Sequence, residues 1–230
     1  MSRSRVLEKL RRIARQTGTV PELPSALPEF PRYDDPLRQF QREVEGVGGV
    51  FLEGRGEEEL RSSLAEVLTA SRTERIFWED QPLFEKHRIP HRLRDPLAFK
   101  EGHLVFSDHF RGKVQFPCIL SSKPYRRRHL ASIRLSASSA ACGLAETGTV
   151  VHETGPGKGR LLSILPPSHL VLLSRQDLLM HSLEFFQSVE PGKRASLLTM
   201  VTGPSRTADI EKTLTVGVHG PRQWFVILTD

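Results

Sequence analysis

The sequence predicts an α/β fold built on a mainly parallel β-sheet. Short apolar runs of strand length alternate along the chain with segments whose apolar residues recur at helical spacing. Strand–helix–strand units of this kind form parallel sheets with right-handed crossovers. The 230 residues are 38% hydrophobic and 26% charged, a balance typical of a globular chain that is large enough for one well-buried domain.

Residues 1–18 are expected to form an N-terminal helical arm, because their apolar residues recur at helical spacing among arginines and lysine. Residues 19–35 contain four prolines, which fix the backbone and favour extended geometry in the preceding residue. This segment is therefore expected to be a linker. Residues 36–230 are expected to form a single α/β domain.

The first half of this domain is expected to begin with a capped helix. Asp35 is a favourable N-cap, and Pro36 is suited to the first helical turn. The elements expected up to residue 130 are helices at 36–45 and 57–68 and strands at 49–52, 75–78, 104–106 and 114–116.

The second half is expected to return to regular strands that complete the sheet. Apolar runs predict strands at 132–135, 149–151, 161–165, 170–173, 196–201 and 224–228. Leu179, Leu183 and Phe186 are expected to be the buried face of one helix. A second helix is expected over residues 206–215, directly after the 196–201 strand.

Composition excludes several classes of protein. The two cysteines, Cys118 and Cys142, form no CxxC pair, so this chain alone cannot supply a zinc ribbon or a four-thiolate iron–sulfur cluster. No apolar run is long enough for a membrane span, and no secretion signal is recognisable, so a cytoplasmic location is expected. The net charge of +6 does not predict nucleic-acid binding, because basic and aromatic residues are not interleaved.

No cofactor and no metal site are expected. The glycine-rich segment 155–160 is not a phosphate-binding P-loop, because Gly159 and not Ser or Thr follows Lys158. No GxGxxG dinucleotide pattern follows a strand. Pro90 separates His87 from His91 and so prevents a helix from placing both imidazoles on one face.

The segment from Val201 to Arg206 is the most informative candidate site. A strand that passes through Gly203 into a helix would leave free backbone N–H groups at a helix N-terminus, where a phosphate or carboxylate binds well. Ser205 would cap that helix and Arg206 would add donors to the anion. Alternatively, Ser205 only caps the helix and nothing binds there.

Two further candidates accompany this segment. Asp209 and Lys212 would lie one turn apart on the same expected helix, either facing the ligand or forming an ordinary surface pair. Glu146 lies among small residues beside Thr147 and Gly148. It either acts as a general base, nucleophile or ligand acceptor, or accepts backbone N–H bonds that fix a turn.

Four segments resemble the LUD domain, the lactate utilisation protein C family. They are Gly143–Thr149 (GLAETGT), Leu165–His169 (LPPSH), Thr202–Glu211 (TGPSRTADIE) and Val216–Arg222 (VGVHGPR). The resemblance implies a three-layer α/β/α sandwich of the NagB/RpiA/CoA-transferase group. It also implies a role in oxidising L-lactate to pyruvate beside two iron–sulfur partner proteins, with this chain as the cluster-free member.

On this interpretation, a small anion or a phosphate-bearing ligand binds in a crevice at the carboxyl ends of the strands. Glu146 would orient the ligand or accept a proton, and Ser205 and Arg206 would hold the anion. The other expected ligand-binding residues are Thr147, Gly148, Gly203, Asp209, Lys212 and His219.

Two alternatives remain. The chain could be a free-standing acyl, CoA or sugar-phosphate transferase or isomerase of the same fold group, with Glu146 as nucleophile or base. It could also be a structural partner with a vestigial pocket. Fold analogy alone does not decide between these functions.

Overall fold

The computed structural model describes residues 4–5, 7–9, 30–73, 76–78, 86–87, 98–100, 103–105, 133–154, 161, 163–189, 195, 197–208, 214–217 and 219–230. Contacts divide the chain into two compact units, residues 1–31 and 32–230. The described residues 4, 5 and 7–9 of the first unit are helical. The second unit contains the sheets and the other helices.

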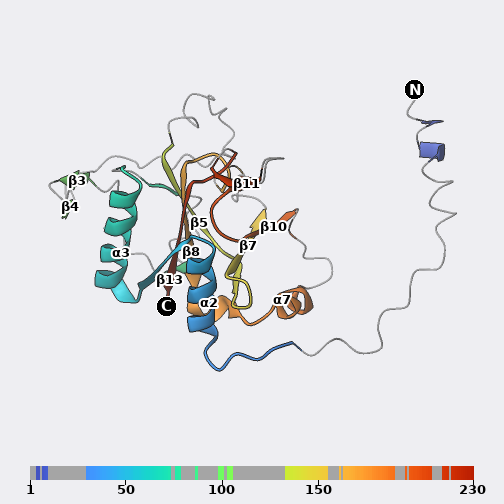
Figure 1. The fold of residues 1–230 in the computed structure, drawn as a ribbon, viewed down its shortest axis with the longest axis horizontal. Coiled ribbons are helices and arrows are strands. Elements are labelled where there is room, and N and C mark those ends of the chain that lie inside the picture. The colour runs from blue at the N-terminus through green and yellow to red at the C-terminus, as the bar shows by residue number, and fades with distance from the viewer. Residues whose placement is uncertain are drawn as a thin grey trace. The chain divides into compact units, whose positions relative to one another are not determined.

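A five-stranded parallel sheet forms the centre of this unit and confirms the predicted fold class (Figure 1). Its strand order is β1-β13-β8-β5-β2, and every neighbouring pair is parallel. The strands are β1 (Val50–Gly54), β13 (Gln223–Thr229), β8 (Ser168–Ser174), β5 (Leu135–Ser139) and β2 (Phe77–Trp78). The central strand β8 is buried along its whole length, as expected for a parallel strand covered on both faces.

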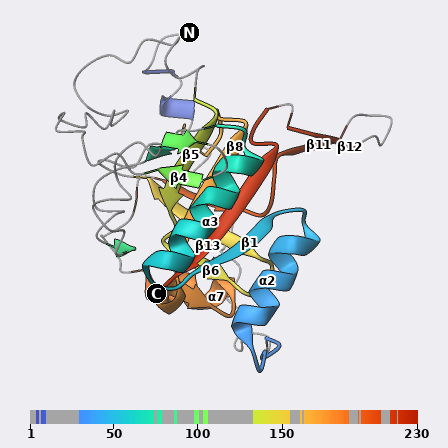
Figure 2. The ribbon, with the colours of Figure 1, turned by 90° about the vertical axis from the view of Figure 1, so that its left-hand side faces the viewer.

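Helix α3 (Gly56–Ala70) covers one face of the parallel sheet and lies across β13 and β1 in Figure 2. Its leucines recur at helical spacing, so they form one apolar stripe. Leu60, Leu64 and Leu68 pack with Leu172 and Phe225 of the sheet in a single buried cluster. The predicted helix 57–68 is therefore confirmed, with two more residues at its C-terminal end.

Helix α2 (Pro36–Gly46) packs on the opposite face. Asp35 caps it as predicted, because its carboxylate accepts a hydrogen bond from the Arg38 N–H at 3.0 Å. Phe40 and Val44 are fully buried against β8 and β13. The C-terminal end of α2 leads directly into β1, so it lies at the edge where the parallel strands begin.

A second, four-stranded sheet shares that opposite face with α2. Its order is β10-β7-β6-β9, with β10 (Leu197–Val201), β7 (Thr149–Thr154), β6 (Cys142–Leu144) and β9 (Leu178–Leu179). The sequence places the 149–151 and 196–201 strands correctly but does not separate them from the parallel sheet. They pair antiparallel with each other, and β7 also pairs antiparallel with β6, because the short turn between β6 and β7 reverses the chain.

A polar cluster is buried between the two sheets. His169 is fully buried, and its ring nitrogens hydrogen-bond to Ser136 Oγ at 2.9 Å and Ser138 Oγ at 3.0 Å. The strand predicted at 132–135 is displaced toward the C-terminus, since β5 spans 135–139 and the described residues 133–134 are not in a strand. The bonds to His169 explain how the two serines of β5 can lie inside the core. Burial, together with the nearby His152, lowers the pKa of His169 well below its usual value, so the ring is neutral.

A second buried histidine lies at the opposite end of the strands. His87 hydrogen-bonds to Thr229 Oγ1 at 2.7 Å and to Ser139 Oγ at 2.8 Å, and so joins the carboxyl ends of β13 and β5. Burial and the adjacent Lys86 lower the pKa of His87 to about 3. Lys86 donates to the Ala140 carbonyl at 2.8 Å and pairs with Asp177 at 2.9 Å.

The predicted helix over residues 206–215 is wrong. The described residues form a hairpin of β11 (Arg206–Ala208) and β12 (Leu214–Val216), paired antiparallel. The Gly217 N–H donates to the Ser205 carbonyl at 2.7 Å and closes the base of this hairpin. Thr207, Thr215 and Val216 are β-branched and favour extended backbone, which outweighs the helix start that Ser205 predicts.

Two other predicted elements differ. The described residues 161 and 163–165 form a turn instead of a strand, because the Leu165 N–H donates to the Leu161 carbonyl at 2.9 Å. Helix α7 (Ser182–Ser188) begins after Leu179, so its buried residue is Phe185, while Phe186 is 56% exposed. The apolar stripe of the helix is therefore displaced from the predicted one.

The remaining short strands are β3 (Ala98–Lys100) and β4 (His103–Val105), which pair antiparallel. The predicted strand 114–116 and the glycine-rich segment 155–160 lie outside the described residues. In the part of the chain that the structure describes, each helix is too short or too polar to cross a membrane.

Candidate functional site

Glu146 lies in the tight turn between β6 and β7. Backbone bonds hold this turn, since Ala145 N–H donates to the Leu179 carbonyl at 2.8 Å and Glu146 N–H to the Met180 carbonyl at 3.0 Å. The Glu146 side chain is 31% exposed, and its Oε2 lies 3.4 Å from His181 Nδ1. The turn thus presents an accessible carboxylate beside a buried imidazole, an arrangement that can accept and hold a proton.

Tyr33 covers the other side of this pair. Its ring centroid lies 5.8 Å from that of His181, at an interplanar angle of 42°. Tyr33 also lines an open cavity of about 620 Å³ over α2, whose walls carry charges of both signs, including Arg38 and Glu45. None of the predicted ligand-binding residues lines this cavity.

Gly148 allows the Glu146 turn to pack directly on α2. Its φ is +63°, in the left-handed region that favours glycine. A Cβ at this position would lie 2.6 Å from the Val44 backbone nitrogen and 2.7 Å from the Glu43 carbonyl carbon. No side chain fits without displacing the helix backbone.

The substitution Gly148→Ala is therefore expected to lower the free energy of unfolding by at least about 2 kcal/mol, from left-handed strain and the backbone overlap together. Denaturant unfolding measures this change. Gly46→Ala is the matched control, because a Cβ there meets no atom within 4 Å and alanine is favourable in a helix. Equal stability of the two variants would contradict the close packing.

A chain of hydroxyl groups joins the Glu146 turn to the 202–206 loop. Thr147 Oγ1 lies 2.6 Å from Thr149 Oγ1, which lies 2.7 Å from Thr202 Oγ1. The pairing of β7 with β10 brings these ends together, since Val201 lies opposite Val150. Two segments more than fifty residues apart in sequence thus meet beside the end of α2.

The 202–206 loop wraps the C-terminal end of α2. Gly203 has a φ of +84°, and a Cβ there would lie 2.8 Å from a Val47 methyl carbon. The Arg206 guanidinium donates to the Val47 carbonyl, an otherwise unsatisfied group at the helix end. Arg206 therefore has a structural bond that the sequence does not predict, while its side chain stays exposed.

Two parts of the expected anion site are corrected. Ser205 does not cap a helix, because β11 follows it; the Ser205 N–H instead donates to the Pro221 carbonyl at 2.8 Å. The loop follows β10, which belongs to the four-stranded sheet, and it lies at the edge where β1 and β13 begin. The site is thus not at the carboxyl ends of the parallel strands. Asp209 and Lys212 lie outside the described residues.

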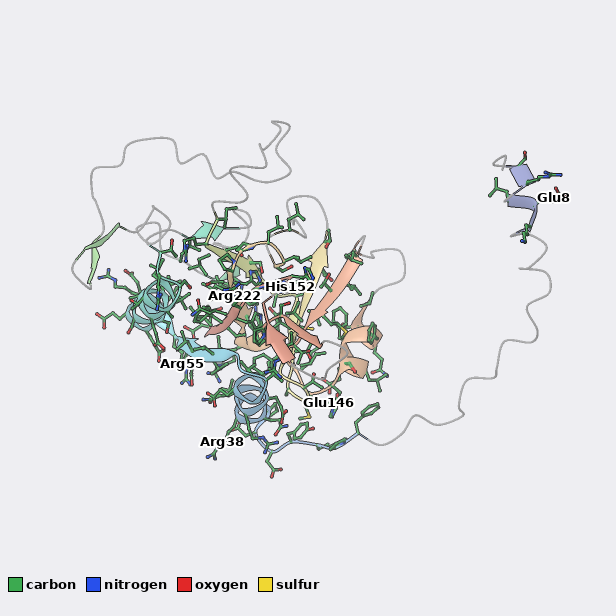
Figure 3. The ribbon with its side chains drawn as sticks, turned by 45° about the horizontal axis from the view of Figure 1, so that its top comes forward. Glu8, Arg38, Arg55, Glu146, His152 and Arg222 are labelled. Carbon is green, nitrogen blue, oxygen red and sulfur yellow. The ribbon has the colours of Figure 1, made fainter. Side chains whose placement is uncertain are left out.

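His219 is exposed in the loop that leads into β13. This loop contacts the 202–206 loop, since a Cβ at Gly220 would lie 2.8 Å from Ser205 Cβ. Figure 3 shows Arg222, at the end of the same loop, well apart from Glu146. Of the predicted residues, Thr147 and Gly148 lie with Glu146, whereas Gly203, Ser205, Arg206 and His219 form a neighbouring group linked through Thr202.

His181 and Tyr33 are the site residues that the sequence does not reveal. His181 follows β9 in a segment with no recognisable motif, and only the parallel pairing of β6 with β9 brings it to Glu146. Cys142, by contrast, is not a nucleophile, because burial, with Asp177 nearby, raises the pKa of its thiol to about 12.

Comparisons with known proteins agree on one family. The model of the LUD domain matches residues 37–229 of this chain. A Geobacillus protein named Lactate utilization protein C is 29% identical over 178 residues, which cover 75% of this chain and 69% of that protein. The protein of the same name from Halalkalibacterium halodurans is 39% identical over 93 residues, 38% of this chain and 40% of that protein.

A solved structure supports the fold. The crystal structure of a duf162 family protein from Deinococcus radiodurans superimposes with a TM-score of 0.52 at 18% identity, covering 85% of this chain and 96% of that one. At this identity the likeness concerns the fold alone. The match to the Halalkalibacterium protein spans less than half of that protein's length.

Proposed function

Because the chain belongs to the LUD domain family, we propose that it is the component without an iron–sulfur cluster in a bacterial system that oxidises L-lactate to pyruvate. Two iron–sulfur proteins would be its partners and would take up the two electrons released from lactate. Relatives named Lactate utilization protein C support this assignment.

The observation that carries the proposal is the accessible Glu146 carboxylate beside the buried His181, at the point where two of the family-like segments meet. A small hydroxy acid has a hydroxyl proton to lose and a carboxylate to be held. Glu146 would accept that proton or orient the hydroxyl, and His181 would hold the Glu146 carboxylate in place.

The anionic end of the ligand would lie toward the 202–206 loop. One end of the hydroxyl chain, Thr147 or Thr202, keeps a proton to donate on that side. The exposed Arg206 supplies positive charge, and the exposed His219 imidazole supplies a further polar group. Lys212 and Asp209 belong to the proposal by sequence only. Anion binding here would depend on side chains and not on a helix N-terminus.

The test is an add-back experiment. Extract of cells that lack this chain is assayed for lactate-dependent dye reduction, before and after addition of the purified full-length protein. Restored activity is expected. If the extract keeps both iron–sulfur proteins and the added protein restores nothing, the lactate role is wrong, and assays of acyl, CoA and sugar-phosphate transfer with Glu146 variants become the next experiment.

A further inference from the structure

Three exposed aliphatic side chains lie together in one turn of the structure. Leu161, Ile164 and Leu165 are 40%, 47% and 51% exposed. The turn is ordered by hydrogen bonds, since the Ile164 and Leu165 N–H groups donate to the Leu161 carbonyl at 3.2 and 2.9 Å. Its apolar side chains are therefore held toward solvent, which is typical of an interaction surface.

This turn belongs to a continuous surface made of three segments. The Arg222 N–H donates to the Pro167 carbonyl at 2.8 Å, and the Ser205 N–H donates to the Pro221 carbonyl at 2.8 Å. A Cβ at Gly220 would lie 3.9 Å from the Ile164 carbonyl oxygen. We call the surface formed by residues 161, 163–167, 205–206 and 219–222 the amino-edge surface, because β8 and β13 begin there.

The charged residues of the amino-edge surface are basic. Arg206 and Arg222 are exposed, and neither has a carboxylate within ion-pair distance among the residues that the structure describes. Other described cations do have such partners, for example Arg55 with Glu53 and Lys86 with Asp177. The three segments of this surface contain no Asp or Glu.

We propose that the amino-edge surface docks a partner protein that offers an apolar depression bordered by carboxylates. Apolar side chains at the centre and charges at the rim are the usual anatomy of a protein interface. Two arginines beside aliphatic residues, without tryptophan or a run of lysines, fit such a partner better than a membrane surface. This inference rests on the proposed function, in which the partner that binds the amino-edge surface is one of the two iron–sulfur proteins.

The test measures binding of the full chain to each purified iron–sulfur protein by calorimetry. Leu165→Asp and Arg222→Glu are each expected to weaken binding at least tenfold, because one buries a charge in the apolar centre and the other adds repulsion at the rim. Phe186→Asp and Arg42→Glu are the controls, as each changes an exposed residue of the same type elsewhere. Both controls are expected to bind like the unmodified chain.

Each outcome has a distinct meaning. If the unmodified chain binds an iron–sulfur protein and the two surface variants bind equally well, the amino-edge surface is not the docking site. If the unmodified chain binds neither protein, the proposed partnership itself fails, and with it the assigned occupant. Binding to anionic phospholipid vesicles that Leu165→Asp abolishes would replace the protein partner by a membrane. Thermal unfolding of each variant confirms that it is folded.

Discussion

Lowering the pH from 7 to 5 is expected to reduce the free energy of unfolding by about 2 kcal/mol through the buried His87 alone, and the buried His169 acts in the same direction. His87 and His169 are neutral in the folded protein, and burial lowers the pKa of both rings, that of His87 to about 3. In the unfolded chain each ring binds a proton below about pH 6.5. Above about pH 6.5 both rings are neutral in the folded and the unfolded state, so they do not change the stability. As the pH falls below about 6.5, only the unfolded chain takes up protons, and the folded protein loses stability until the pH reaches the folded pKa.

Denaturant unfolding measured between pH 7 and pH 5 checks this expectation. His87→Gln should remove about 2 kcal/mol of the loss in unfolding free energy between pH 7 and pH 5, and His169→Gln should reduce that loss as well. His219→Gln, at an exposed position, is the control for losing a histidine. An unchanged pH dependence in His87→Gln would mean that His87 is not held neutral between Ser139 and Thr229.

Glu146→Gln is expected to reduce lactate-dependent dye reduction by about 100-fold or more in the add-back assay, the usual range for loss of a positioned acid–base group. The glutamine keeps the size and polarity of the side chain but cannot accept the proton. Because Glu146 is partly exposed and its turn is held by backbone bonds, the unfolding temperature should change little.

Glu153→Gln is the matched control, since Glu153 is a half-buried glutamate on the adjacent strand β7 and lies outside the proposed site. It is expected to restore activity like the unmodified chain. His181→Gln should lower the rate less than Glu146→Gln, as expected for a residue that positions another. Full activity of folded Glu146→Gln would remove Glu146 from the mechanism while leaving the docking proposal open to its own test.

Local features of the sequence predict much of the fold. The Asp35–Pro36 helix start, the leucine stripe of α3 and the apolar runs of β8 and β13 are each encoded within one element. Periodicity and capping depend on residues a few positions apart, so they can be recognised without the tertiary structure. Family-like segments around Glu146 also mark one part of the site.

The local sequence of residues 206–215 does not distinguish a helix from a β-hairpin. Ser205, a favourable N-cap directly after a strand, predicts a helix there, but the described residues form a hairpin closed by the Gly217–Ser205 bond. Whether such a segment is helical depends on which neighbours it pairs with, and those neighbours are distant in sequence. The anion site was expected at a helix N-terminus after Ser205, and this part of the prediction is wrong because a strand begins there.

The parallel α/β class and the first two helices of the domain follow from the amino-acid sequence, which also singles out Glu146 as a candidate site residue. Three contacts are visible only in the folded protein: His181 lies beside Glu146, Thr202 bonds to Thr149 after the Glu146 turn, and Arg206 binds the end of α2. The folded protein also shows how polar residues are buried, since Ser136 and Ser138 hydrogen-bond to His169 of a neighbouring strand. The physical reason is that these contacts join residues distant in sequence, and their free energy depends on burial that no local pattern encodes.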